Sequence, residues 1–134
     1  MDEYVKNGDV RIGYWHFAFL GPGSFASAEA SECAADQDAF WVYHDLIFTD
    51  LAQNKRQLSN DDLKTYAKEL GLDSQAFDQC LDSGKYKEYV EQQSGLARQI
   101  GVQSTPAFLT NGTPIMGAQP FENFKAIISQ YLAE

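Results

Sequence analysis

The sequence predicts an α/β fold in which a block of helices separates one strand from a later pair of strands. Three patterns support this prediction. Residues 10–20 carry large apolar side chains on both alternating faces, which is typical of a strand covered on both sides of a sheet. Residues 24–100 show helical apolar spacing punctuated by caps. Residues 106–116 have the pattern of a strand, a two-residue turn and a second strand, and a closing helix follows.

The length and the net charge limit the classes of protein to which this chain can belong. At 134 residues the chain is long enough for one domain with a substantial core. Ten Lys and Arg stand against nineteen Asp and Glu, so the net charge is −9. An acidic chain without a basic stripe argues against binding to nucleic acid or to an anionic membrane surface. No apolar run has the length of a membrane span, and the N-terminus lacks the pattern of a signal peptide.

The first residues predict the end of a helix followed by a strand. Residues 1–6 fit the last turns of a helix, which Asn7 and Gly8 would terminate. Residues 10–20 then form the first predicted strand. The Gly-Pro-Gly sequence at residues 21–23 ends it.

A long helical region follows. We expect Ser24 to be its N-cap, the region to end near Asp50, and an interruption near Asp36. Residues 51–59 form a predicted polar loop. The dense apolar face of the second part consists of Phe40, Trp41, His44, Leu46, Ile47 and Phe48.

Three further helices are predicted before the strand pair. Ser59 or Asn60 caps the first, which Gly71 ends. Asp73 caps a short second helix, and residues 85–100 form the third. The closing helix spans residues 120–132 and begins with proline, which is favoured at the first helical position. Its apolar stripe consists of Phe121, Phe124, Ile127, Ile128 and Tyr131.

The strand pair begins at Pro106. Proline cannot donate to a ladder, so it belongs at the first residue of a strand or at an edge. Thr105 is pushed out of the helical region by the proline ring, and the Thr105–Pro106 bond is a candidate cis peptide. Asn111 and Gly112 predict the turn between the two strands.

Several stretches together resemble a known family. They are Thr105-Pro106-Ala107-Phe108, the Asn111-Gly112 turn and Gly117, residues 31–37 followed by Phe40-Trp41-x-x-His44-Asp45, and Phe77-x-x-Cys80-Leu81. In this order and spacing they resemble the DsbA-like thiol:disulfide oxidoreductases, which have a thioredoxin-like fold with a cis-proline loop facing a Cys-x-x-Cys motif. The resemblance implies a partial thioredoxin-like domain at residues 1–20 and 101–134, and an inserted helical domain at residues 21–100.

This sequence departs from the family pattern at its N-terminus. No Cys-x-x-Cys occurs, and the resemblance implies that a first strand and the active-site cysteines would precede residue 1, so we expect an N-terminally truncated chain. Thiol–disulfide exchange needs a low-pKa thiolate with a resolving thiol beside it. Cys33 and Cys80 fall within predicted helices among apolar neighbours. We therefore predict no catalytic residue here and no redox turnover by this chain alone.

The resemblance implies a function for the parent protein. We expect a fragment of a DsbA-like protein-disulfide oxidoreductase acting on exported proteins, in an extracytoplasmic location, whether periplasmic, extracellular or membrane-anchored. Thr105 and Pro106 would bind an extended, unfolded substrate; the other interpretation of these two residues is a tight corner only. The alternative function is a non-catalytic peptide-binding or scaffold module, and a weaker third option is a glutathione-using relative. The redox partner is not indicated.

Cys33 and Cys80 have three interpretations. Because the family is commonly extracytoplasmic, where disulfides persist, we expect a structural disulfide between them. The others are two buried free thiols and a redox-active pair. No cofactor and no metal are predicted, because His16 and His44 are isolated and no zinc or EF-hand spacing occurs. Each histidine is expected to be hydrogen-bonded in or near the core.

The absent strand also bears on assembly. In a thioredoxin-like sheet it would lie between the strand at residues 10–20 and the strand after Pro106. Its absence leaves two apolar strands with unpaired inner edges, which invites pairing with another chain. We therefore expect a homo-oligomer, a dimer or a swapped assembly, formed through this vacant central slot.

Overall fold

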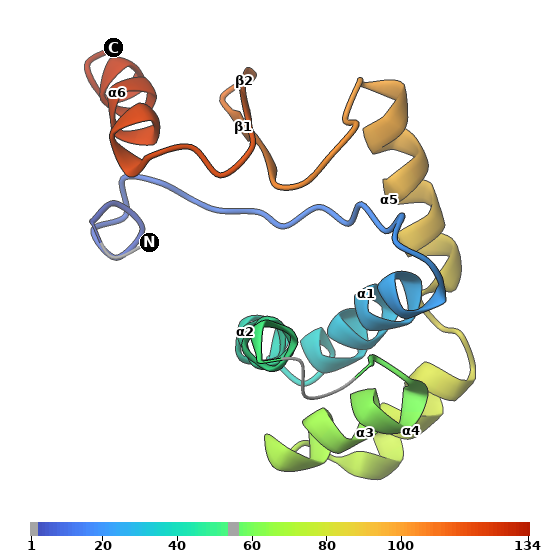
Figure 1. Ribbon diagram of the computed structural model, residues 1–134. Coiled ribbons are helices and arrows are strands. Elements are labelled where there is room, and N and C mark those ends of the chain that lie inside the picture. The colour runs from blue at the N-terminus through green and yellow to red at the C-terminus, as the bar shows by residue number, and fades with distance from the viewer. Residues whose placement is uncertain (1–2, 54–56) are drawn as a thin grey trace. The chain divides into compact units, whose positions relative to one another are not determined.

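The computed structural model describes residues 3–53 and 57–134, which form two compact units (Figure 1). Unit 1 comprises Met1–Trp15 and Ala97–Glu134, and unit 2 comprises His16–Leu96. Unit 2 is helical. Unit 1 contains the hairpin and the C-terminal helix.

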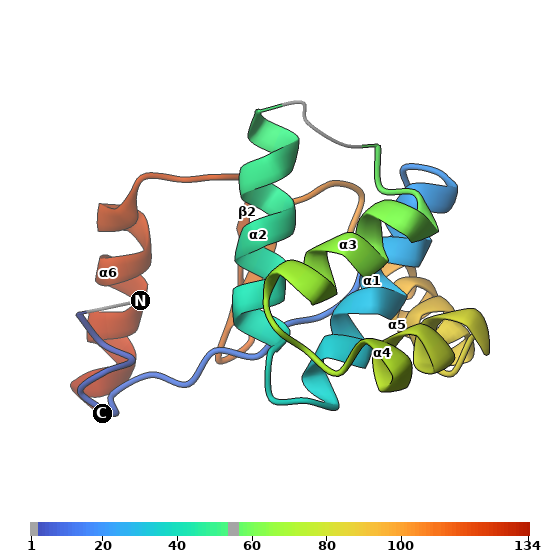
Figure 2. The same ribbon diagram turned by 90° about the horizontal axis from the view of Figure 1, so that it is seen from below.

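Unit 2 is built on four helices and most of a fifth. They are α1 (Pro22–Ala35), α2 (Phe40–Ala52), α3 (Asn60–Glu69), α4 (Ser74–Asp82) and α5 (Lys87–Gln99), whose last three residues belong to unit 1. Helix α1 contacts α2, α3 and α4, and α3 also packs on α2 and α4 (Figure 2). The largest buried side chains at this centre are Tyr43, Leu63, Tyr66 and Phe77.

The helix boundaries follow local capping chemistry. The Ser59 hydroxyl accepts from the Asp62 N–H, and the Asp62 carboxylate accepts from the Ser59 N–H, so a capping box starts α3. The Asp73 carboxylate accepts from the Ala76 N–H and starts α4. These predicted caps are confirmed. The predicted interruption near Asp36 is also confirmed, since α1 ends at Ala35 and α2 begins at Phe40.

Two predictions for the first helices are wrong. Helix α1 starts at Pro22 rather than after Ser24, because Gly21 takes the N-cap position with φ of 90° and proline is preset for the first turn. The apolar face expected on α2 is not buried as a whole: Trp41 and Phe48 are 39% and 54% exposed. Of the predicted face, Ile47 is buried, and the other buried residues of α2 are Tyr43 and Asp50. Of the loop predicted at residues 51–59, α2 takes the first two residues, and residues 54–56 lie outside the described part of the chain.

Unit 1 contains an antiparallel hairpin of β1 (Ala107–Thr110) and β2 (Thr113–Met116). Asn111 and Gly112 both have positive φ, 46° and 91°, as the predicted two-residue turn requires. Helix α6 (Phe121–Leu132) contacts one face of the hairpin through Phe124 and Tyr131. The rings of Phe108 and Phe124 meet edge-on with centroids 4.9 Å apart, and the hydroxyls of Thr113 and Tyr131 lie 2.8 Å apart.

The start of the chain packs on α6 as a turn and not as a helix. The helix expected at residues 1–6 is absent from residues 3–6, and residues 1 and 2 lie outside the described range. Asn7 donates to the Glu3 carbonyl at 2.8 Å, and Gly8 closes the turn with φ of 82°. Lys125 pairs with Glu3 at 3.2 Å across to α6.

The first predicted strand is also wrong. Residues 10–19 are extended, but β1 and β2 are the only strands in residues 3–53 and 57–134. Side chains of α5 take two of the backbone amides: the N–H of His16 donates to Gln93 Oε1 at 2.9 Å, and the N–H of Ala18 donates to Ser94 Oγ at 3.0 Å. The segment with alternating apolar side chains is therefore extended but does not pair with another strand.

Candidate functional site

The loop before β1 lies on the surface. Gly101, with φ of 94°, ends α5, and the Val102 N–H donates to the Ala97 carbonyl at 3.0 Å. Residues 103–106 are exposed, and the Thr105–Pro106 peptide bond is cis. The Pro106 carbonyl accepts from the Gly117 N–H at 2.8 Å, which attaches the loop to the base of the hairpin. The structure thus brings Thr105 and Pro106 together on an exposed loop that leads directly into β1.

The hairpin register determines which backbone groups face outward. In an antiparallel pair joined by a two-residue turn, Thr110 and Thr113 form a hydrogen-bonded pair, and such pairs alternate along the ladder. The bond from Gly117 to Pro106 follows the same alternation. The N–H and C=O groups of Ala107 and Leu109 therefore point away from β2, along the outer edge of β1. Sequence analysis singled out this edge as the inner edge of the strand after Pro106, and the Asn-Gly turn sets the register that determines which residues face it.

The two cysteines form a disulfide between α1 and α4. The Cys33–Cys80 S–S distance is 2.04 Å, and Cys33 and Cys80 are 1% and 9% exposed. Since the sequence holds only these two cysteines, the chain has no free thiol. The predicted disulfide bond is confirmed, and the interpretation as two free thiols is wrong. Burial of both sulfurs within a helical core disfavours the redox-active interpretation.

A polar cluster lies beside this disulfide, at the end of α1. Asp36 accepts a hydrogen bond from Lys85 Nζ at 2.6 Å and another from the Tyr86 hydroxyl. Burial alone would raise the pKa of the Asp36 carboxyl, but these two hydrogen bonds outweigh it and hold that pKa below its ordinary value. A hollow of about 350 Å³ opens next to the cluster and reaches Cys80. The cluster connects α1 to the start of the segment leading into α5.

The two histidines have ordinary structural surroundings. His16 is buried, with Nε2 2.6 Å from Glu32 Oε1 and its ring edge-on to Phe40. His44 is half-buried on α2, with Nδ1 3.0 Å from Asp45 Oδ1. Neither belongs to a metal-ligating group, because residues 3–53 and 57–134 contain no cluster of three or more His, Cys, Asp or Glu.

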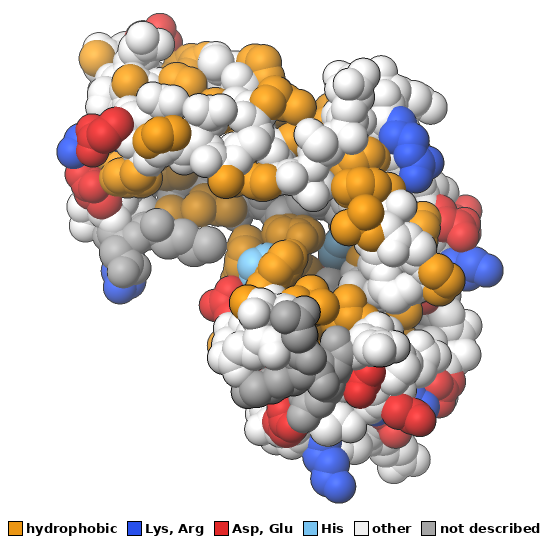
Figure 3. All heavy atoms as spheres, viewed as in Figure 1, with side chains coloured by type: hydrophobic (Ala, Val, Ile, Leu, Met, Phe, Trp, Pro, Cys, Tyr) orange, Lys and Arg blue, Asp and Glu red, His pale blue; other side chains and the backbone are white. Residues whose placement is uncertain are grey.

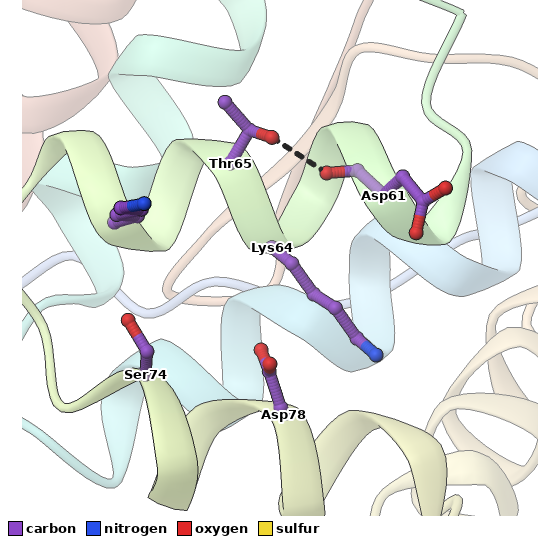
Figure 4. Close-up of a pocket in the computed structure, with 6 residues that line it drawn as sticks. Asp61, Lys64, Thr65, Ser74 and Asp78 are labelled. Atoms are coloured by element: carbon purple, nitrogen blue, oxygen red, sulfur yellow. Dashed lines mark hydrogen bonds between the residues drawn. The ribbon is translucent and has the colours of Figure 1, made fainter.

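A second hollow, of about 450 Å³, lies between α3 and α4 (Figure 4). Thr65 Oγ1 donates to the Asp61 carbonyl at 2.8 Å, and Lys64 Nζ lies 2.8 Å from Asp82 Oδ2. The lining is polar and consists of Asp61, Lys64, Thr65, Lys68, Ser74 and Asp78. The features there are intrahelical bonds and exposed ion pairs, as on ordinary helix surfaces.

A buried carboxylate, that of Asp50, escaped sequence analysis. Asp50 is 7% exposed and accepts a hydrogen bond from the Tyr66 hydroxyl at 2.8 Å. The signal was present, because Asp50 follows Tyr43 and Ile47 at helical spacing on the same face of α2. A carboxylate on such a face requires a hydrogen-bond donor in the core, and Tyr66 supplies one.

Comparison with known proteins now decides the family. A family model described as Thioredoxin matches residues 1–130. The chain belongs to the thioredoxin family. A crystal structure of a thioredoxin-like oxidoreductase from Silicibacter pomeroyi DSS-3 shares the fold, with a TM-score of 0.74 over 90% of this chain and 68% of that one, at 20% sequence identity. The predicted thioredoxin-like α/β fold is confirmed.

Named relatives place this thioredoxin-family chain more closely. It is 29% identical over 136 residues to the Probable disulfide bond formation protein D of Bacillus anthracis, covering 98% of this chain and 62% of that protein. It is 26% identical over 137 residues to Disulfide bond formation protein D of Bacillus subtilis (strain 168), covering 97% and 60%. The resemblance to DsbA-like thiol:disulfide oxidoreductases is thereby confirmed.

A third match is to a protein of different name. The chain is 35% identical over 120 residues to the Na(+)/H(+) antiporter NhaA of Herminiimonas arsenicoxydans, covering 90% of this chain and 18% of that protein. The thioredoxin-family chain itself has no helix in residues 3–53 and 57–134 that is long and apolar enough to cross a membrane. It spans about three-fifths of the length of the disulfide bond formation proteins it matches.

Proposed function

We propose that this chain is the substrate-recognition part of a DsbA-like protein-disulfide oxidoreductase acting on exported, unfolded proteins. The observation that carries the proposal is the exposed loop of Thr105 and Pro106, which leads directly into β1. The backbone groups of such a loop can pair with the backbone of an extended polypeptide, so recognition depends little on the sequence of that polypeptide.

The chain by itself has no thiol–disulfide turnover in this proposal. Its two cysteines are joined in a buried disulfide in unit 2, and no Cys-x-x-Cys occurs in the sequence. Exchange requires attack by a thiolate on an accessible sulfur. The reacting thiols therefore come from outside these 134 residues. An extracytoplasmic location accompanies the proposal, because the Cys33–Cys80 disulfide persists in an oxidising compartment.

Binding of a reduced and alkylated unfolded protein, measured by calorimetry, tests the recognition step. Pro106→Ala changes the shape of the loop and is expected to weaken binding about tenfold, or ~1.4 kcal/mol. Pro114→Ala is the matched control, since Pro114 lies in the same hairpin on β2, away from the loop, and should leave affinity unchanged. Equal losses in the two variants would contradict the proposal.

An insulin-reduction assay tests the absence of turnover. We expect no rate above the uncatalysed reaction for the wild-type chain. A rate that Cys33→Ser or Cys80→Ser removes would show that the internal disulfide is the redox centre, and the proposal would then fail.

A non-catalytic peptide-binding module is the second candidate. The burial of both cysteines in one disulfide favours it, because nothing redox-active then accompanies the loop. The coding sequence upstream of Met1 separates the two functions. An in-frame Cys-x-x-Cys supports the oxidoreductase, and a stop codon directly upstream supports the module.

A further inference from the structure

The dipeptide Asn-Gly occurs twice in the chain, as Asn7-Gly8 and as Asn111-Gly112. Asparagine before glycine can lose its side-chain amide without a catalyst, because glycine has no Cβ to shield its backbone nitrogen. That nitrogen attacks the asparagine Cγ, and the bond from Cγ to the side-chain nitrogen breaks. The side-chain nitrogen leaves as ammonia and takes the proton of the backbone N–H with it. Water then opens the resulting succinimide ring to aspartate or to its β-linked isomer.

Hydrogen bonds hold both reacting groups of Asn7-Gly8. The side-chain Nδ2 of Asn7 donates to the Glu3 carbonyl at 2.8 Å, and the N–H of Gly8 donates to the Val5 carbonyl at 3.1 Å. The reaction requires the side chain to turn towards the glycine nitrogen and that nitrogen to lose its proton. Both hydrogen bonds must break first, which adds to the barrier. The fold therefore protects Asn7.

The hairpin turn leaves the same two groups of Asn111-Gly112 unrestrained. Both residues are exposed and lie between the paired strands, outside the ladder. Within residues 3–53 and 57–134, neither the Asn111 side-chain amide nor the Gly112 N–H forms a hydrogen bond. Water reaches both groups, so no protein contact has to break before the nitrogen attacks. The two identical dipeptides thus differ in their surroundings.

Two hydroxyls polarise the peptide bond between Asn111 and Gly112. The Tyr131 hydroxyl donates to the Asn111 carbonyl at 3.4 Å and lies 2.8 Å from Thr113 Oγ1. A hydroxyl has one proton, so the Thr113 hydroxyl donates to Tyr131 when Tyr131 donates to Asn111. Hydrogen bonds in such a chain strengthen one another. A donor on this carbonyl draws electron density from the Gly112 nitrogen, and the Gly112 N–H therefore loses its proton more easily.

We propose that Asn111 is a site of spontaneous deamidation in the folded chain and that the Tyr131 hydroxyl promotes the reaction. Either product places a carboxylate within residues 99–121, which contain no Lys, Arg, Asp, Glu or His. The surface over the hairpin in Figure 3 carries hydrophobic and uncharged side chains. The β-linked isomer also lengthens the main chain of a turn in which both residues need positive φ. The reaction therefore alters the hairpin that follows the Pro106 loop, whether or not that loop binds peptides.

Peptide mapping by mass spectrometry, after incubation of the full chain at neutral pH, tests the proposal. Asn111 is expected to convert at least about tenfold faster than Asn7 in the folded chain. In concentrated urea the two dipeptides should convert at similar rates, because unfolding removes the contacts that distinguish them. Equal rates in the folded chain, or faster conversion of Asn7, overturn the proposal. So does the same preference for Asn111 in urea, because sequence and not structure would then cause it.

Tyr131→Phe tests the role of the hydroxyl. Conversion of Asn111 is expected to slow about threefold, while conversion of Asn7 stays unchanged. Tyr86→Phe is the matched control, since it removes a tyrosine hydroxyl that is bonded to Asp36 in unit 2, and it should change neither rate. A loosened hairpin would speed the reaction of Asn111 rather than slow it. An unchanged or faster rate in Tyr131→Phe therefore overturns the role of Tyr131.

Discussion

The two units of this chain differ in how many large apolar side chains they bury, although both expose some. Unit 2 buries large residues completely, among them Tyr43, Tyr66 and Phe77. In the described residues of unit 1, the buried apolar residues are Ala97 and Ile115, and neither is fully buried. None of the residues of α6, all of which the structure describes, is buried. Unit 2 therefore has the core of an independent domain, while unit 1 leaves much of its apolar surface in water.

This difference shows where function is to be sought. Isolated exposed apolar residues are normal, but several gathered on one small unit indicate an interaction surface. Those of the hairpin and α6 are Phe108, Leu109, Met116, Phe121 and Leu132. Unit 2 is held by a disulfide and by buried hydrogen bonds.

Loss of the disulfide is expected to have the largest effect, and to be confined to unit 2. Cys33 and Cys80 are 47 residues apart, and in the chain-entropy model a cross-link of that span stabilises a domain by about 4 kcal/mol. Cys33→Ala with Cys80→Ala should lower the free energy of unfolding of unit 2 by about that amount. Amide hydrogen exchange, measured separately for the two units, reports it.

The control is the wild-type chain treated with a reductant. Reduction breaks the disulfide but keeps both cysteine side chains, so it separates loss of the bond from the packing change in the double variant. Both should lose protection in α1 to α4, while the hairpin and α6 amides keep theirs. Equal loss in both units would show that unit 1 depends on unit 2 for its stability.

Two tyrosines give a smaller and matched test. Tyr66 is fully buried and donates to the buried Asp50 carboxylate at 2.8 Å. Tyr66→Phe is expected to cost about 1.5–3 kcal/mol in unit 2, because a hydrogen bond to a charged group is lost. Tyr131 is half-buried and its hydroxyl meets Thr113. Tyr131→Phe should cost only about 0.5–1 kcal/mol. A larger loss for Tyr131→Phe in urea denaturation would contradict the difference between the units.

The same contrast explains what the sequence could predict. Caps and turns are local, so Ser59, Asp73 and the Asn111-Gly112 turn were placed correctly from neighbouring residues. The strand at residues 10–20 needed a partner strand, and alternation of side chains carries no information on whether one exists. There the side chains of Gln93 and Ser94 took the backbone amides instead.

The candidate site was partly predictable for the same reason. Pro106 marks the start of β1 through its own chemistry, and the resemblance supplied the pairing of Cys33 with Cys80. The carboxylates of Glu32, Asp36 and Asp50 gain their roles only from residues distant in sequence: His16, Lys85 and Tyr66. Such contacts depend on how the helices pack, which local patterns do not specify.

The smallest predicted effect concerns pH and the Asp36 cluster. The hydrogen bonds from Lys85 and Tyr86 hold the pKa of Asp36 below its ordinary value in the folded chain. The cluster therefore stabilises the fold above the unfolded pKa of about 4, and that contribution is lost as pH falls through the lower folded pKa. Lys85 and Asp36 side chains are 52% and 35% exposed, so solvent screening limits the contribution to under about 1 kcal/mol.

Urea denaturation of wild type and Asp36→Asn measures this contribution. The wild type should be the more stable at pH 7. The difference should shrink as pH falls below about 4 and vanish below the lowered folded pKa of Asp36, where the carboxyl is protonated in both states. Asp38→Asn removes the same charge from the same connection between α1 and α2 and serves as the control. A difference for Asp36→Asn that persists unchanged at low pH would mean that shape rather than charge stabilises this corner. The disulfide and the buried hydrogen bond from Tyr66 to Asp50 would then be the interactions that hold the helices of unit 2 together.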